Sequence, residues 1–582
     1  MDTVKIKVNG IETEVAADSL ILDACTAAGV RVPTLCFLRD INEIGACRMC
    51  IVETSTSRGL VASCVNRVSE GMEIRTSTPR LHKARKTTLE LILSNHRMDC
   101  LSCRRSMDCE LQALAREYGV DQAKFSANED LRPQLDESAP HLVRDNSKCI
   151  LCRRCTAVCS ANQYVGVIGA NERGFNTHIG SPFDIPLNST SCVYCGQCIA
   201  VCPTGALTEK DDTGKVWRAF SDESKYVVVG TAPSVRAQIG ECFDLPIGTN
   251  VDGRLVAALR RLGFAKVFNV DTAADLTILE EGTELLHRLS SGGPLPLITS
   301  CSPGWIKFCE HYYPEMLDNI STCKSPQQMY GAMMKTYYAE KEGIKPEDMF
   351  VVSIMPCTAK KFEVTRDEGA AGVPDVDVSL TTRELAEMIK RAGIDFVNLP
   401  DEEFDPVFGI ASGAAQIFGA TGGVMEAALR TVYEIVTGQT LEALEFYDVR
   451  GVEGIKEAEY DLNGTVVRVA VSSGLANAHK LLEMVKSGEK DYHFIEIMAC
   501  PGGCVNGGGQ PCQPGFVRNN IDLRAERAKA LYSGDQAMAL RKSHENPAVN
   551  ELYATFLGEP GSHKAHETLH THYKPRELFN ED

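Results

Sequence analysis

Cysteine constrains this chain more than any other residue type. The 582 residues include 24 cysteines, and most of them gather in clusters built on C-x2-C pairs. A disulfide between residues three apart is strained, and the N-terminus alternates apolar and polar residues like a strand rather than like an export signal. The spacing therefore indicates metal ligation instead of a disulfide framework.

Length and charge narrow the class further. A chain of 582 residues exceeds what one core holds, so we expect several domains. The net charge of −18 argues against a nucleic-acid partner and suits docking to positively charged redox partners. Because no apolar run approaches the ~20 residues that span a bilayer, we expect no membrane partner and a cytoplasmic location.

A doubled four-cysteine run is the most specific motif. Each copy has the spacing C-x2-C-x2-C-x3-C, and the second copy ends in Cys202-Pro203. In bacterial two-cluster ferredoxins the fourth cysteine of each run serves the other cluster. We expect one [4Fe–4S] cluster on Cys149, Cys152, Cys155 and Cys202, and a second on Cys192, Cys195, Cys198 and Cys159. Structural zinc is the alternative, but zinc motifs do not use this doubled run.

Two further ligand groups precede this run. The first comprises Cys36, Cys47, Cys50 and Cys64. Its pattern resembles the [2Fe–2S] domain at the start of large hydrogenases and respiratory dehydrogenase subunits; it departs from the plant-type spacing, and zinc stays open as an alternative. The second comprises His96, Cys100, Cys103 and Cys109. We expect it to bind a [4Fe–4S] cluster whose potential the neutral imidazole raises, and the four clusters to act in series.

Strand-like runs alternate with amphipathic helices from about residue 210 to 515. The clearest strands are expected within 225–232, 295–301, 349–357 and 493–500, and three of these segments end at a cysteine. Thr381 and Glu384 form a capping-box pattern that predicts a helix over 381–394. The alternation indicates an α/β region with parallel sheets, whose ligand sites lie beyond the carboxyl ends of the strands.

Three segments of this region resemble the signature motifs of [FeFe]-hydrogenases. They are Thr299-Ser-Cys-Ser-Pro-Gly-Trp305, the segment from Met355 to Glu363, and the segment from Glu496 to Pro511. Segments 232–234 and 419–426 look like the same family, and the resemblance covers nearly the whole chain. It is similar in particular to the catalytic large subunit of cytoplasmic NAD(P)-linked hydrogenases. The resemblance implies reversible H2 oxidation and proton reduction at an H-cluster, in which one cysteine bridges a [4Fe–4S] cubane to a two-iron subcluster with CO, cyanide and a dithiolate.

The same resemblance implies the site residues. Cys357, Cys500 and Cys504 match cubane ligands, and Cys504 matches the bridging one. Lys360 matches a cyanide-binding lysine. The residues that match the remaining surroundings of the diatomic ligands are Pro233, Ser234, Gln327, Met355 and Met498. A proton relay is implied for Glu281, Glu284, Arg288, Ser321 and Cys301; a solvated helix face is the alternative for each glutamate alone.

One position departs from the family pattern. The first motif of the family reads Thr-Ser-Cys-Cys-Pro, and its second cysteine holds the cubane, whereas this chain has Ser302 there. A serine alkoxide is a poor ligand for a soft iron–sulfur cluster. Cys301, Ser302 and Cys323 are therefore all candidates for the fourth cubane ligand, and the sequence leaves the choice among them open.

We expect a multidomain α+β chain that carries one [2Fe–2S] cluster, three accessory [4Fe–4S] clusters and the H-cluster. Its expected parts are a β-grasp [2Fe–2S] domain (1–80), a small His/Cys3 cluster domain (81–125), a two-cluster ferredoxin-like domain (126–209), a two-lobed α/β catalytic domain (210–519) and a helical, small-subunit-like wrapping tail (520–582).

Electron partners are expected on other chains, because no Gly-x-Gly-x-x-Gly fingerprint and no flavin motif occurs. The expectation is a hetero-oligomer with subunits that bind flavin and NAD(P), or ferredoxin as direct partner. The alternatives are a non-catalytic iron–sulfur electron carrier and an H2-sensing relative with an incomplete active site. The relay glutamates, Lys360 and the glycines 507–509 favour the enzyme.

Overall fold

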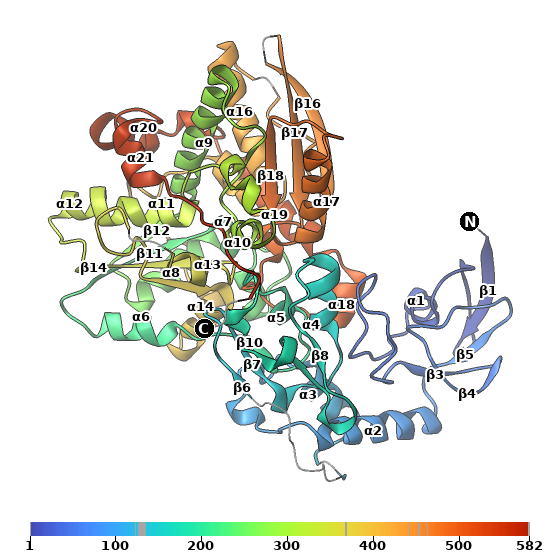
Figure 1. Ribbon diagram of the computed structural model, residues 1–582. Helices are drawn as coiled ribbons and strands as arrows, with labels where there is room; N and C mark the ends of the chain where they lie inside the picture. Colours follow the sequence, from blue (N-terminus) through green and yellow to red (C-terminus); the bar gives the residue numbers. More distant parts are fainter. Residues whose placement is uncertain are drawn as a thin grey trace.

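The computed structural model describes residues 2–122, 124–125, 135–366, 369–441, 443–451, 454–462 and 464–579. Figure 1 shows the N-terminal sheet at one side of the molecule and the cysteine-rich segments below a larger region built on two sheets. The expected division between residues 125 and 126 borders residues 126–134, which lie outside the described part.

The first part of the chain is a five-stranded sheet with one helix. The strand order is β2-β1-β5-β3-β4. The bounds are Thr3–Val8 (β1), Ile11–Ala16 (β2), Ile51–Thr54 (β3), Ser57–Ala62 (β4), Glu73–Arg75 (β5) and Ile21–Ala27 (α1). Asn9 and Gly10 join β1 to β2 with φ angles of 50° and 88°, the left-handed values that a two-residue hairpin requires.

Two longer helices and five short strands build the cysteine-rich segments that follow. Thr78 accepts the N–H of Leu81 and so caps α2 (Pro79–Ser94). The other elements are α3 (Glu110–Glu117), the sheet of β10 (Leu207–Glu209), β7 (Leu142–Asp145) and β6 (Leu135–Asp136), and the hairpin of β8 (Gly169–Asn171) and β9 (His178–Gly180).

The doubled cysteine run is a structural repeat. Short helices α4 (Arg154–Ala157) and α5 (Gln197–Ala200) occupy the same place in the two copies. Each follows two left-handed residues at equivalent positions, Leu151 and Arg153 in the first copy and Tyr194 and Gly196 in the second. The backbone therefore curls identically around each set of thiols.

Two sheets form the larger region. One contains β12 (Lys266–Asn269), β11 (Tyr226–Thr231), β14 (Met349–Met355) and β15 (Val378–Thr381), all parallel. The other contains β13 (Leu297–Ile298), β18 (Phe494–Met498), β17 (Thr465–Ser473) and β16 (Ile455–Leu462). All four expected strands are confirmed. The expectation of parallel sheets holds except for the edge strand β16, which is antiparallel to β17.

Helices cover both sheets, as Figure 1 shows. They are α6 (Thr213–Phe220), α7 (Pro233–Arg236), α8 (Asp252–Leu262), α9 (Asp271–Ser291), α10 (Pro303–Tyr312), α11 (Pro326–Met333), α12 (Ala339–Glu342), α13 (Lys360–Glu363), α14 (Thr382–Arg391), α15 (Gly413–Gln416), α16 (Gly423–Thr437) and α17 (Leu475–Lys486). The capping box of Thr381 and Glu384 at the start of α14 is confirmed.

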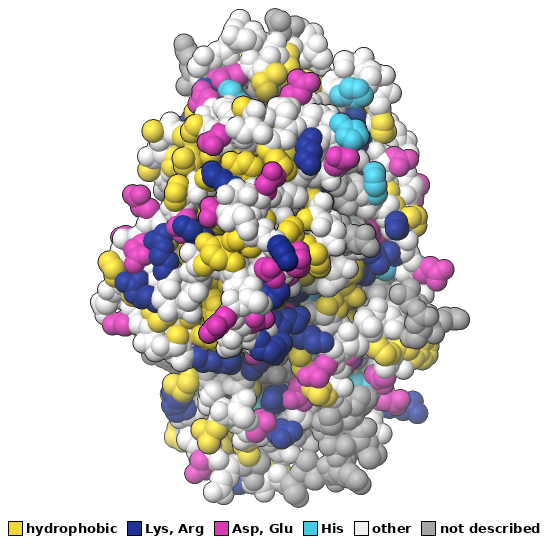
Figure 2. Space-filling view, turned by 90° about the vertical axis from the view of Figure 1, so that its left-hand side faces the viewer, with side chains coloured by type: hydrophobic (Ala, Val, Ile, Leu, Met, Phe, Trp, Pro, Cys, Tyr) yellow, Lys and Arg dark blue, Asp and Glu magenta, His cyan; other side chains and the backbone are white. Residues whose placement is uncertain are grey.

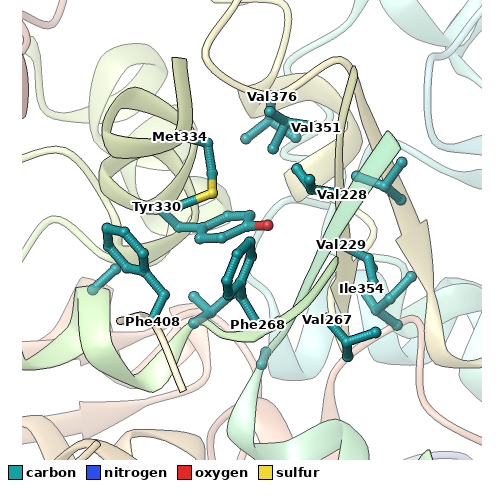
Figure 3. Packing of buried hydrophobic residues seen from close by; sticks show 14 of the residues in the cluster. Val228, Val229, Val267, Phe268, Tyr330, Met334, Val351, Ile354, Val376 and Phe408 are labelled. Carbon is teal, nitrogen blue, oxygen red and sulfur yellow. The ribbon is translucent and has the colours of Figure 1, made fainter. Parts of the chain in front are cut away.

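The core over the first sheet is mainly aliphatic and contains a small group of aromatic rings. Figure 3 shows the ring of Tyr330 lying among Phe268, Phe408 and Met334. A Cβ at Gly230 of β11 would lie 2.7 Å from this ring, so the close approach of α11 to the sheet requires glycine there.

The last residues wrap the larger region. Helices α18 (Gly515–Asn520), α19 (Leu523–Ala537), α20 (Pro547–Leu552) and α21 (His563–Leu569) follow one another. Asp535 of α19 pairs with the buried Arg430 at 2.9 Å. Beyond α20, the N–H of Lys324 donates to Leu569 and the N–H of Thr571 donates to Thr322, so the tail pairs with the segment that follows β13.

Asp275 of α9 links the tail to the larger region and is expected to make stability depend on pH. It accepts hydrogen bonds from Ser412 and, at 2.8 Å, from Asn546 of the tail. Burial raises the pKa of Asp275 to about 6. Since the folded state holds this proton more tightly than the unfolded chain, stability should fall by about 3 kcal/mol as pH rises from about 4 through 6.

Anaerobic urea unfolding of Asp275→Asn should lack this component of the pH dependence, and Asp222→Asn on the surface should retain it. A constant difference between wild type and Asp275→Asn from pH 4 to 7 would contradict the assignment.

Among the described residues, no helix combines the length and the apolar character that a bilayer crossing needs.

Candidate active site

The carboxyl ends of β14 and β18 meet at one cavity of about 70 Å³. Met355 ends β14 and Met498 ends β18, which is the placement that the strand pattern predicts for a ligand site. All six residues expected around the diatomic ligands line this cavity, namely Pro233, Ser234, Gln327, Met355, Lys360 and Met498.

The cavity contains a polar atom that calls for a bound group. The hydroxyl of Ser234 is buried and has no hydrogen-bond partner among the described residues. Native proteins rarely leave such a group unpaired, so a ligand that accepts a hydrogen bond fits here. Gly419 packs against this serine: a Cβ there would lie 3.0 Å from Ser234 Cβ and 2.5 Å from Leu531 Cδ1. Backbone without a side chain thus borders the cavity on this side.

Three cysteines lie together beside the cavity. Burial raises the pKa of Cys357, of Cys500 and of Cys504, and the neighbouring thiols raise the last two further, that of Cys504 to about 12. Buried thiols with mutually raised pKa values are poorly suited to hold charge unaided. Thiolate ligation to a cationic iron–sulfur core relieves this cost, so the group fits a metal cluster.

Lys360 of α13 is held at the cavity wall by three acceptors. Its Nζ donates to Glu363 Oε2 at 2.8 Å, to Ser325 Oγ at 2.7 Å and to the carbonyl of Cys301 at 3.2 Å. The same Glu363 oxygen accepts the amide of Gln327 at 2.9 Å. The ammonium group is therefore fixed in place and presents its charge to an otherwise largely apolar cavity.

The expected relay residues include two carboxylate groups, Glu284 and Glu281, each with its own hydrogen-bond donors. Glu284 Oε2 accepts the hydroxyl of Ser321 at 2.8 Å, and Glu284 Oε1 accepts Arg288 Nη2 at 2.6 Å. Glu281 Oε1 accepts the N–H of Ser300 at 3.2 Å and its hydroxyl at 3.1 Å. Burial and the charge of Glu284 raise the pKa of Glu281 to about 7, against the hydrogen bonds from Ser300. A carboxyl group with this pKa exchanges protons readily near neutral pH.

The three candidates for the fourth cubane ligand lie in different places. Cys301 lines the cavity, and the charges of Glu281 and Cys504 raise the pKa of its buried thiol further. Ser302 Oγ accepts the N–H of Ala499, the residue before Cys500, at 3.3 Å. Cys323 Sγ lies 4.0 Å from Glu284 Oε2, among the relay residues.

The structure brings together three of the four expected accessory groups. Cys149, Cys152, Cys155 and Cys202 line one cavity of about 20 Å³, so the fourth cysteine of the second run joins the first three of the other. The other thiols, Cys159, Cys192, Cys195 and Cys198, raise one another's pKa values and therefore also lie close together. In the N-terminal domain, Cys50 Sγ lies 3.2 Å from Cys64 Sγ, and Cys47 N lies 3.5 Å from Cys36 Sγ.

The four accessory ligand groups do not follow one another in a single series. Two of them lie separately beside the first ferredoxin group, that of Cys149, Cys152, Cys155 and Cys202. Asn42 Nδ2 donates to the carbonyls of Cys36 and Cys152, which joins the N-terminal group to the first ferredoxin group. Cys103, from the group expected around His96, also lies beside the first ferredoxin group: a Cβ at Gly205, three residues after Cys202, would lie 2.6 Å from Cys103 Sγ. The second ferredoxin group adjoins the active site, where a Cβ at Gly508 would lie 2.3 Å from the carbonyl of Cys195.

Sequence reasoning assigned no role to several groups at the site. Glu363, Ser300 and Glu496 all stand inside the quoted motifs, which was the available signal. Glu496 accepts the N–H groups of Gly422 and Met425 at 2.7 Å each and so caps α16. Burial raises its pKa to about 7.

Comparison with known families gives matches along the chain. Residues 225–508 match "Iron only hydrogenase large subunit, C-terminal domain" and residues 521–576 match "Iron hydrogenase small subunit". Upstream, the matches are "2Fe-2S iron-sulfur cluster binding domain" (1–79), "NADH-ubiquinone oxidoreductase-G iron-sulfur binding region" (85–124) and "4Fe-4S dicluster domain" (148–206).

Individual relatives agree over the full length. The chain is 48% identical to the NADP-reducing hydrogenase subunit HndD of Solidesulfovibrio fructosivorans, over 99% of this chain and 100% of that one. It is 43% identical to iron hydrogenase 1 of Clostridium pasteurianum, over 98% and 99% of the two chains. Among solved structures, the [FeFe]-hydrogenase HydA1 from Chlamydomonas reinhardtii matches with a TM-score of 0.57 and 44% identity, over 63% of this chain and 99% of the other.

Proposed function

The chain belongs to the iron-only hydrogenase family, and from this premise we propose that it is the catalytic subunit of an NAD(P)-linked or ferredoxin-linked complex that interconverts H2 with protons and electrons. The observation that carries the proposal is the cavity at β14 and β18, where grouped thiols, the fixed Lys360 ammonium and the unpartnered Ser234 hydroxyl surround a small apolar space. This combination suits a soft metal cluster with anionic diatomic ligands.

The cofactor would be held by residues on two sides. Cys357, Cys500 and Cys504 would hold a cubane, and Lys360 and Ser234 would donate to cyanide. The bound group supplies the iron chemistry that splits or forms H2. Met355 and Met498 contribute apolar surface that keeps water out of the cavity.

Protons would travel between Cys301 and the surface through Glu281, Ser321, Glu284 and Arg288. The supporting contacts are the Ser321–Glu284 and Arg288–Glu284 hydrogen bonds and the raised pKa of Glu281. Electrons would travel through the second and then the first ferredoxin cluster, with two further branches at the [2Fe–2S] domain and the His96 group.

Partner subunits that bind flavin and NAD(P) would exchange electrons with these branches, in a cytoplasmic hetero-oligomer. We divide the chain at residues 80, 125, 209 and 519, as the cysteine groups suggest. Figure 2 shows Lys and Arg side chains gathered in a band across the lower middle of one face, with Asp and Glu among them. Although the net charge of the chain is −18, this face offers cationic groups to a partner.

Infrared spectroscopy on the fully matured protein tests the proposal. Bands of iron-bound CO and cyanide should appear, with about 20 irons per chain, and H2 should evolve with a reduced low-potential dye. An iron–sulfur electron carrier would lack both the bands and H2 evolution, and that result would defeat the proposal.

His96 offers a separate test of the accessory ligands. Its Nδ1 is buried without a hydrogen-bond partner among the described residues, and burial lowers the pKa of the ring, which keeps it neutral and able to bind iron. His96→Cys should keep the cluster and shift its reduction potential to a more negative value, since a thiolate adds negative charge. Electron paramagnetic resonance during a redox titration measures this shift. His82→Cys, on the exposed face of α2, should leave every potential unchanged.

A further inference from the structure

We propose that Ser302, through its side-chain oxygen, is the fourth ligand of the cubane held by Cys357, Cys500 and Cys504. The inference rests on the proposed function and concerns the one ligand position that the grouped cysteines leave unfilled. A [4Fe–4S] core offers four iron corners, and three thiols meet at this place.

The backbone directs Ser302 and its neighbour to opposite sides. Ser302 has extended φ and ψ of −104° and 99° just before α10, and successive side chains on extended backbone alternate in direction. Cys301 lines the active-site cavity, beside Lys360 and Met355, and two of the grouped cysteines, Cys357 and Cys504, reach the same cavity from the cubane side. Ser302 therefore faces the other way, toward the loop after β18, where its Oγ lies 3.3 Å from Ala499 N.

The residues around Ser302 belong to segments that carry the grouped cysteines. A Cβ at Gly304, the second residue of α10, would lie 3.1 Å from Ala499 Cβ and 3.9 Å from Cys195 Cβ. The start of α10 therefore lies between Ala499, the residue before Cys500, and Cys195, an expected ligand of the second ferredoxin cluster. Cys195 and Cys357 are also the thiols that most strongly raise the pKa of Cys500, so these groups occupy one locality.

Cys323 has its contacts among the expected relay residues. Its side chain is fully buried, and its Sγ lies 4.0 Å from Glu284 Oε2. The charged groups that act on it are Glu281, Glu284 and Glu280, and none of the three grouped cysteines is among them. The backbone N–H of Cys323 donates to Ser321 Oγ at 3.2 Å, so Cys323 adjoins a residue of the proposed proton relay. The Cys323 thiol therefore lies beside the proposed proton relay.

Ligation by Ser302 needs no redox step. The Oγ–H bond breaks as the Oγ–Fe bond forms, the proton passes to water, and the iron keeps its electrons; the positive charge of the metal favours the alkoxide. Oxygen is a harder donor than sulfur and stabilises the more oxidised iron. An oxygen-ligated cubane should therefore have a more negative reduction potential than the same cubane with four thiolates.

The experiment compares Ser302→Cys and Ser302→Ala with wild type in the matured protein, by infrared spectroelectrochemistry and iron analysis. The CO and cyanide bands report this site alone, because the accessory clusters carry no such ligands. Ser302→Cys should shift the potential at which the bands interconvert to a more positive value. Ser302→Ala should lose about one iron per chain, as a three-cysteine cubane does, together with most of the band intensity. Cys323→Ala should leave iron content and bands unchanged.

Ser302→Cys keeps a ligand-capable side chain of similar size, so it remains informative even where Ser302→Ala fails to fold. An unchanged potential in Ser302→Cys, or full iron and unshifted bands in Ser302→Ala, would overturn the assignment of Ser302 while leaving the hydrogenase function intact. Absence of the bands from wild type would instead overturn the proposed function itself.

Discussion

Glu281→Gln is expected to lower H2 turnover about 100- to 10,000-fold, the range that a positioned proton-transfer group contributes. Glu281 is buried, its carboxylate accepts both the N–H and the hydroxyl of Ser300, and its pKa is raised to about 7. A carboxyl group at this pKa alternates between its protonated and ionised forms at neutral pH. An amide of the same shape keeps the packing and cannot carry the proton.

Two measurements separate proton transfer from damage to the site. The infrared bands of CO and cyanide should keep their frequencies and intensity in Glu281→Gln, while dye-driven H2 evolution collapses. Glu342→Gln, at the exposed end of α12, serves as the matched control and should keep full turnover. Turnover of Glu281→Gln within tenfold of wild type would show that protons bypass this carboxyl group.

Lys360→Met should remove the CO and cyanide bands and lower the free energy of unfolding by about 3–5 kcal/mol, the usual effect of stranding one partner of a buried ion pair. Lys360 and Glu363 are each 9% exposed at the side chain and lie 2.8 Å apart. Removing the ammonium leaves the Glu363 carboxylate buried with only neutral donors, from Ser325 and Gln327.

The double variant Lys360→Met/Glu363→Gln distinguishes the two effects. It should regain part of the lost stability, because no buried charge remains unpaired, and should still lack the infrared bands, because the cyanide donor is gone. Lys529→Met removes one partner of an exposed pair with Glu526 and should cost less than about 1 kcal/mol. Equal losses of stability in the single and the double variant would contradict this account of the Lys360–Glu363 pair.

Spacing along the chain predicted the ligand groups because a C-x2-C turn places two thiols on one metal irrespective of the rest of the fold. The strands at β11, β14 and β18 were equally accessible, since buried parallel strands read as continuous apolar runs. The antiparallel edge strand β16 was not predicted: its half-exposed, alternating residues give a weaker signal and lie in no motif.

The partners of the catalytic groups could not be predicted in this way. Glu363 binds Lys360 within one turn of α13, but its contact with Gln327 depends on how α11 packs against α13. The sequence left Cys323 as a candidate ligand. Only the tertiary fold shows that it lies beside Glu284. Contacts between distant segments depend on packing, which residue spacing does not encode.

The pairing of the tail with residues 322–324 bears on the order in which the protein is made. Residues 322–324 lie near the middle of the chain and follow Ser321 of the proposed relay. Leu569 and Thr571 hydrogen-bond to them, and the ribosome adds these two residues about 245 residues later. Until then the backbone beside Glu284 has no cover from the tail. During synthesis this side of the catalytic region therefore stays open, and it closes only when the segment after α21 emerges.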